Sequence, residues 1–122
     1  MNKKYFSQRP ELKPIIYVYD IPDAENRKGL LKIGYTTRSA KGRIKEQLGT
    51  AGLNYNILLE QEAVRSDGST FDDHEIHRYL RKKDFANPDG EWFACRVQDV
   101  KAAILAIKNR TENIQDRIFD FK

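Results

Sequence analysis

The 122-residue chain contains one cysteine, one tryptophan and four prolines, and it has no long apolar segment. A single cysteine excludes an intramolecular disulfide, and the sequence has no CxxC pair of the kind that holds zinc. No apolar run approaches the roughly 18 residues that a membrane-spanning helix needs. The first residues also lack the apolar stretch of a signal peptide. Together these absences predict a cytoplasmic protein with no membrane partner.

The composition predicts one hydrated domain with a small core. Hydrophobic residues make up 39% of the chain and charged residues 33%. A chain of this length is large enough for a single modest core. The net charge of +4 mildly favours a nucleic-acid partner. Three groups of lysines and arginines fall on the three predicted helices, where solvated faces are their usual place.

Two segments near the N-terminus predict a pair of neighbouring strands. Residues 15–19 and 30–36 are rich in β-branched and aromatic side chains, and turn-forming residues separate them. In an antiparallel hairpin of matching register, alternation places Tyr17 on the same face as Lys32 and Gly34. A face that carries a phenol, an ammonium and a bare glycine suits anion binding better than it suits a core.

The rest of the chain predicts three helices and one more strand. Ser39 is a plausible N-cap and Gly49 a stop for the first helix. Residues 54–64 form the third strand, residues 69–84 the second helix, and Asp99 opens the third helix. The order β-β-α-β-α-α predicts an α+β domain with a small three-stranded antiparallel sheet flanked by helices.

The predicted domain occupies residues 14–110. Residues 1–13 precede the first strand and are interpreted as an N-terminal extension. Residues 111–122 lose the apolar stripe of the third helix and are interpreted as a linker to a further domain.

Three blocks in this order resemble the GIY-YIG nuclease family: Ile15-Ile16-Tyr17, Lys32-Ile33-Gly34 and Gly90-Glu91-Trp92-Phe93. The likeness is to a phage and bacterial branch that has KIG where other members have YIG. Ile15 replaces the first glycine of the family pattern, and Lys32 replaces its second tyrosine. The resemblance covers residues 14–110 and implies a GIY-YIG-like fold. It also implies a Mg²⁺- or Mn²⁺-dependent endonuclease that cuts DNA in restriction or repair, with a helicase-like or DNA-binding domain attached.

The resemblance assigns the hairpin residues to catalysis and substrate binding. Tyr17 is the expected general base, and its phenolate must be favoured because a tyrosine with an ordinary pKa near 10 is a poor base. Lys32 is expected to lower that pKa or to contact the phosphate. Tyr19 shares the face as a second phenol. Gly34 is expected to let the backbone approach the sugar-phosphate.

The first helix supplies a candidate phosphate ligand. Arg43 lies on the border of the stripe that Ala40 and Ile44 turn inward, where an arginine is costly unless an anion meets it. The resemblance implies that this anion is the scissile phosphate. The alternative is a salt bridge between Arg43 and a nearby acid. Arg38 is nearer to the strand end and is a rival for the phosphate.

The second helix supplies the candidate metal ligand. Asp73 points close to the direction that Ile76 turns inward, and Glu75 lies on the flank. The resemblance implies one acid that binds a divalent metal; position favours Asp73 and residue type favours Glu75. His77 follows Asp73 by four residues. It either orients a carboxylate or a water, or it is a helix histidine that is simply hydrogen-bonded within the fold. The alternative is an acidic first turn that complements the helix dipole.

Two other functions compete with the enzyme. The substitutions at Ile15 and Lys32 favour a catalytically silent nucleic-acid-binding module on the same fold. An unrelated α+β interaction domain, on which the cationic helices are merely surface, is the third hypothesis. A zinc site built on His74 and His77 has no third ligand of the usual kind.

Overall fold

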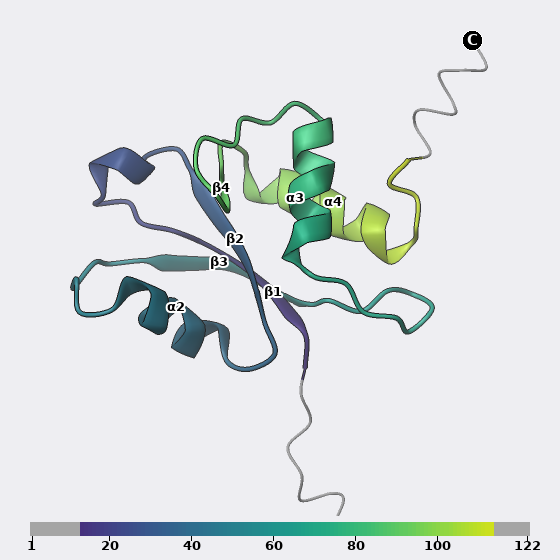
Figure 1. Cartoon of the computed structure of the whole chain (residues 1–122), viewed down its shortest axis with the longest axis horizontal. Helices are drawn as coiled ribbons and strands as arrows, with labels where there is room; N and C mark the ends of the chain where they lie inside the picture. Colours follow the sequence, from purple (N-terminus) through teal and green to yellow (C-terminus); the bar gives the residue numbers. More distant parts are fainter. Residues whose placement is uncertain (1–12, 114–122) are drawn as a thin grey trace, which may run out of the picture.

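The structure is a computed structural model that describes residues 13–113. Within this range, four strands form one antiparallel sheet in the order β3-β1-β2-β4 (Figure 1). The strands are β1 (Ile15–Asp20), β2 (Leu31–Thr36), β3 (Asn56–Glu62) and β4 (Trp92–Phe93). The helices are η1, a short 3-10 turn (Glu25–Arg27), α2 (Ala40–Leu48), α3 (Asp73–Lys82) and α4 (Val97–Lys108). The predicted N-terminal extension and C-terminal linker fall largely on residues 1–12 and 114–122, which lie outside the described range.

The hairpin register is the predicted one. Tyr17 faces Gly34 across the β1–β2 ladder, and Tyr19 faces Lys32. Strand β1 also pairs with β3 on its other side, so the hairpin tyrosines lie on the central strand. The α+β class is confirmed.

The predicted count of three strands is wrong. Residues 92–93 join the free edge of β2 as β4, where Phe93 pairs with Leu31 and Trp92 with Lys32. A strand of two paired residues is shorter than the four or more that make period-two alternation detectable. This pairing places Glu91 next to the middle of β2, although the two are far apart in the sequence.

The two faces of the sheet support two separate cores (Figure 1). Helices α3 and α4 cover one face, where Ile16, Val18 and Ile33 are buried. Helix α2 covers the other face, and Ile44 of α2 packs there in one cluster with Tyr17 and Tyr19. Both tyrosines are only 1% exposed. The sequence predicted that the face with Tyr17, Lys32 and Gly34 would bind an anion and not form a core. That prediction is wrong for the rings of Tyr17 and Tyr19, which are buried in a core.

The helix ends agree with the sequence in α2 and differ in α3 and α4. The Ser39 hydroxyl accepts a hydrogen bond from the Gly42 N–H at 3.0 Å, and Gly49 ends the helix with φ of 59°. Helix α3 begins later than predicted, because Asp72 is its N-cap. Helix α4 begins earlier, at Val97, and Asp99 is its third residue.

Candidate active site

A glutamine of α2 holds the polar groups of the hairpin together. The Tyr19 hydroxyl donates to Gln47 Oε1 at 3.0 Å, and Lys32 Nζ donates to the same oxygen at 3.1 Å. Gln47 Nε2 in turn donates to the Tyr17 hydroxyl at 3.1 Å. Because one amide binds both phenols and the ammonium, these groups have fixed positions relative to each other.

Lys32 is buried and ion-paired. Its side chain is 11% exposed, and Nζ lies 2.9 Å from Oε1 of Glu91, which is 38% exposed. The Ile33 N–H donates to the backbone oxygen of Glu91 at 3.0 Å. Glu91 immediately precedes β4, so the short strand fixes this acid beside Lys32.

Asp73, at the start of α3 on the opposite face of the sheet, lies beside Glu91. The residue is 6% exposed. Burial raises the pKa of its carboxyl, the His77 ring lowers it in part, and the charge and hydrogen bond of Glu91 raise it. Two carboxyl groups therefore lie next to each other, and one of them, that of Glu91, is paired with Lys32.

His77 is buried below this group and holds it in place. Its Nε2 lies 2.9 Å from the carbonyl oxygen of Ile33 and 3.8 Å from Oδ2 of Asp73. The ring packs against Phe93, with 5.2 Å between ring centroids, and the residue is 3% exposed. This geometry makes His77 a positioning residue for α3 and Asp73 and keeps it from direct contact with a substrate.

Of the two candidate metal-binding acids, Asp73 joins the cluster and Glu75 does not. Glu75 Oε1 accepts a hydrogen bond from Arg65 Nη2 at 2.5 Å, in an ion pair whose arginine side chain is 10% exposed. The two acids are two residues apart on α3 and therefore point in different directions.

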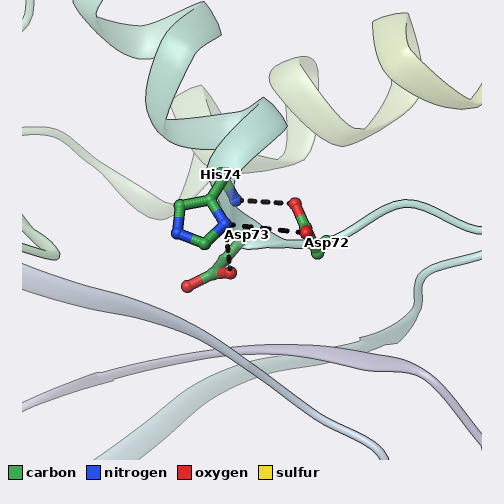
Figure 2. A group of neighbouring side chains, drawn as sticks. All are labelled: Asp72, Asp73 and His74. Atoms are coloured by element: carbon green, nitrogen blue, oxygen red, sulfur yellow. Dashed lines mark hydrogen bonds and ion pairs between the residues drawn. The ribbon is translucent and has the colours of Figure 1, made fainter.

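Figure 2 shows Asp72, Asp73 and His74 at the start of α3. Their ligand atoms all lie within 4.8 Å of one another. Asp72 Oδ1 accepts a hydrogen bond from the backbone N–H of His74 at 3.0 Å, which is the role of an N-cap. His74 Nδ1 lies 3.8 Å from Oδ1 of Asp73. The capping role accounts for Asp72, as the dipole interpretation expects, but it does not account for the buried Asp73.

The donor set fits the metal that the resemblance implies. Mg²⁺ and Mn²⁺ prefer carboxylate oxygens. Asp73 and Glu91 bring two such groups together, one of them buried; Lys32 pairs with Glu91, and the rings of His77 and His74 lie near Asp73. Two neighbouring carboxylates of this kind are stabilised either by a proton or by a cation.

Arg43 lies at the rim of the cluster and is not buried. Its side chain is 49% exposed, and Nη1 lies 3.3 Å from Oε1 of Glu46, so the predicted alternative of a salt bridge is present in solvent. The Arg43 guanidinium also lowers the pKa of Tyr17 through charge and a hydrogen bond, which places it near that hydroxyl. Arg38 and Arg43 both line a groove of about 460 Å³ between the end of β2 and α2. Its other lining residues are Tyr35, Thr36, Thr37, Ser39, Gly42 and Glu46.

The expectation of a lowered pKa for Tyr17 is wrong. Burial raises the pKa of this phenol most strongly; the hydrogen bond from Gln47 lowers it, Glu91 raises it, and Arg43 lowers it. The balance is a raised pKa, and that of Tyr19 rises to about 12, also mainly by burial. Both phenols are therefore protonated at neutral pH.

Gly34 accommodates the ring of Tyr17. A Cβ atom at this position would lie 2.4 Å from both Cζ and the hydroxyl oxygen of Tyr17. The phenol of Tyr17 therefore already fills the space beside Gly34. The prediction that a sugar-phosphate approaches the backbone at this point is wrong.

The sequence interpretation assigned no role to Gln47 or Glu91. Gln47 follows Arg43 by four residues on the border of the inward stripe, and a polar amide at such a position is a detectable signal. Glu91 belongs to a block that carried the family resemblance, but nothing local connects it with Lys32. Their roles depend on contacts between distant parts of the chain.

Comparison with known proteins places the domain in a family. The model of the T5orf172 domain family matches residues 14–108, from just before β1 to the end of α4, and the chain belongs to this family. T5orf172 domains are nuclease-like or DNA-binding domains, and they form a family different from the GIY-YIG nucleases. No curated protein and no solved structure matches the chain significantly. Among the described residues, no helix is both long and apolar enough to cross a bilayer.

Proposed function

We propose that this domain is a metal-dependent endonuclease that hydrolyses DNA phosphodiester bonds with a GIY-YIG type of site. The observation that carries the proposal is a chain of polar contacts: Gln47 binds Tyr17 and Lys32, and Glu91 is paired with Lys32 and also lies beside Asp73. These five residues come from five parts of the chain: β1, β2, α2, α3 and the residue before β4. Buried ionisable groups in such an arrangement are typical of functional sites.

The arginine groove gives the phosphate a place to bind. Arg43 and Arg38 line it together with threonine and serine hydroxyls. A guanidinium donates paired hydrogen bonds to non-bridging phosphate oxygens and neutralises the charge that develops during hydrolysis. The exposure of Arg43 suits this role because a long substrate has to reach it from solvent.

The two carboxyl groups would hold the metal. Asp73 and Glu91 are the residues that fit Mg²⁺ or Mn²⁺, and the ion when bound supplies a Lewis acid that stabilises the leaving oxygen. Glu91 also raises the pKa of Tyr17, so neutralising its charge favours the phenolate. Arg43 acts in the same direction. The phenolate of Tyr17 then takes a proton from the attacking water.

One observation favours a second candidate function, a catalytically silent nucleic-acid-binding module. The pKa of Tyr17 is raised, and its hydroxyl already accepts a hydrogen bond from Gln47. If no cation neutralises Glu91, the site binds phosphate through the arginines without a base to activate water. The attached helicase-like or DNA-binding domain stays a prediction in either case.

Plasmid cleavage separates the two functions. Supercoiled DNA is incubated with the protein in Mg²⁺, and EDTA provides the metal-free control. Arg43→Ala should slow nicking by roughly 10²–10³-fold, the usual loss for one transition-state donor. Arg78→Ala is the matched control, because Arg78 is an exposed arginine of α3 that lines a different cavity. DNA binding without nicking in the unmodified protein would establish the silent module instead.

A further inference from the structure

A second cavity, of about 380 Å³, lies beside the cluster at the C-terminal end of α2. Its polar lining includes Tyr19, Lys32 and Gln47, so it adjoins the proposed catalytic groups directly. Its volume is near the lower end of the roughly 300–1,000 Å³ that is typical of small-ligand pockets. Nothing in the proposed hydrolysis uses this space.

One wall of the cavity is a stacked arginine. Arg27 Cζ lies 4.4 Å from the centroid of the Trp92 ring, and Arg27 Nη1 lies 2.9 Å from Oδ2 of Asp89. The Arg27 side chain is 23% exposed, whereas Trp92 is only 7% exposed. A guanidinium fixed between a tryptophan and a carboxylate is a preformed platform, and unpaired bases stack on guanidinium planes of this kind.

The rest of the lining suits a flat ring with polar edges. Leu48 and Leu53 contribute apolar surface, and Leu53 is 39% exposed, so its side chain is accessible to a ligand. Asn26 contributes an amide at the rim. The Lys32 ammonium has three N–H donors, of which its contacts with Gln47 and Glu91 account for two.

The position of the cavity connects it with the scissile phosphate. Arg43 and Gln47 are four residues apart on α2, so they are neighbours on one face of the helix, one lining the arginine groove and the other the cavity. We propose that this cavity, which we call the base pocket, accepts the base of an unpaired nucleotide next to the scissile phosphate. The inference rests on the proposed nuclease function and specifies its substrate as single-stranded or locally unpaired nucleic acid. A base inside an intact duplex is stacked and paired and cannot enter.

Fluorescence tests the base pocket without cleavage. Trp92 is the single tryptophan of the chain, so its emission reports on the pocket directly. In EDTA, a short single-stranded oligonucleotide should change this emission, and an abasic oligonucleotide of the same length should not. The abasic strand should also bind roughly five- to a hundredfold more weakly, the range that base stacking contributes. Equal affinity and equal emission changes for the two strands would overturn the proposal.

A pair of leucine variants provides the matched control. Leu53→Glu places a carboxylate in the wall of the pocket, and Leu58→Glu places the same charge on β3 at a side chain of similar exposure (37%). Both leucines are exposed, so both variants are expected to fold. Leu53→Glu should weaken binding of the intact strand roughly tenfold and leave the abasic strand bound as Leu58→Glu binds it. The same affinities for both variants would also overturn the proposal.

The two proposals fail in different ways. A protein that nicks plasmid but shows no dependence on the base retains the nuclease function and loses the base pocket. A protein whose Trp92 emission responds to the base but that cuts no DNA retains the pocket and loses the nuclease function.

Discussion

Gly34→Ala tests whether the position of Tyr17 depends on a missing side chain. Replacing a strand glycine by alanine normally stabilises a protein by about 0.4–1 kcal/mol, because the unfolded chain loses conformational freedom. Here the new Cβ would lie 2.4 Å from Cζ and the hydroxyl oxygen of Tyr17 and 2.7 Å from Cε1. Carbon atoms in contact prefer about 3.5–4.0 Å, so the ring must move by roughly 1 Å or more.

The ring has no easy direction in which to move. Tyr17 is stacked against Tyr19, with 6.2 Å between ring centroids, and its hydroxyl is held by Gln47. Overpacking of this kind costs about 1–3 kcal/mol. A displacement of about 1 Å in a catalytic group slows a reaction by roughly 10²-fold. We therefore expect Gly34→Ala to lower the free energy of unfolding by about 1–3 kcal/mol and to slow DNA cleavage by roughly a hundredfold.

Urea unfolding and plasmid nicking measure the two effects. Gly42→Ala is the matched control for stability, because its Cβ would meet only Ser39, at an ordinary 3.6 Å. In helix α2 that substitution should stabilise by up to about 1 kcal/mol. The reasoning is refuted if Gly34→Ala is as stable as Gly42→Ala and cleaves DNA at the unmodified rate.

The other predictions concern the buried ionisable groups. Because the pKa of Asp73 is raised, its charged form destabilises the fold, and this cost appears as pH rises through the raised pKa. Asp73→Asn should therefore raise the melting temperature at pH 7, leave it nearly unchanged at pH 3, and slow cleavage strongly. A lower melting temperature at pH 7 would contradict the burial argument. The raised pKa of Tyr19, about 12, contributes stability below pH 10 that is lost as pH rises through 12. A spectrophotometric titration of tyrosinate should lose its step near pH 12 in Tyr19→Phe, and an unchanged titration would show that Tyr19 is not the group responsible.

The hairpin and its register were predictable because their signals are local. Period-two alternation determines which side chains of β1 and β2 share a face, so Tyr17, Lys32 and Gly34 were placed together correctly. The limits of α2 followed from Ser39 and Gly49, whose capping chemistry is also local. Residues 91–95 were predicted as a short extended segment but not as a fourth strand, because two paired residues carry no periodicity and the edge pairing of β4 depends on β2 being in place.

The polar connections of the site were not predictable, because they depend on contacts between residues that are far apart in the sequence. Gln47 acquires its role because α2 packs over the tyrosines, and Glu91 acquires its role because β4 pairs beside Lys32. The raised pKa of Tyr17 follows from burial under α2, whereas the sequence showed only a tyrosine near a lysine. The choice between Asp73 and Glu75 depended on Arg65, which lies in the turn before α3 and pairs with Glu75 only once that turn folds back on the helix.

A double-variant cycle of cleavage rates tests the central claim most directly. The claim is that Tyr17 and Asp73, which come from opposite layers of the fold, act on the same phosphodiester bond. Plasmid nicking rates are measured for Tyr17→Phe, Asp73→Asn and the double variant under identical Mg²⁺ concentrations. If both groups serve one step, the double variant should be about as slow as the slower single variant. Rate losses that multiply in the double variant would contradict a single shared site.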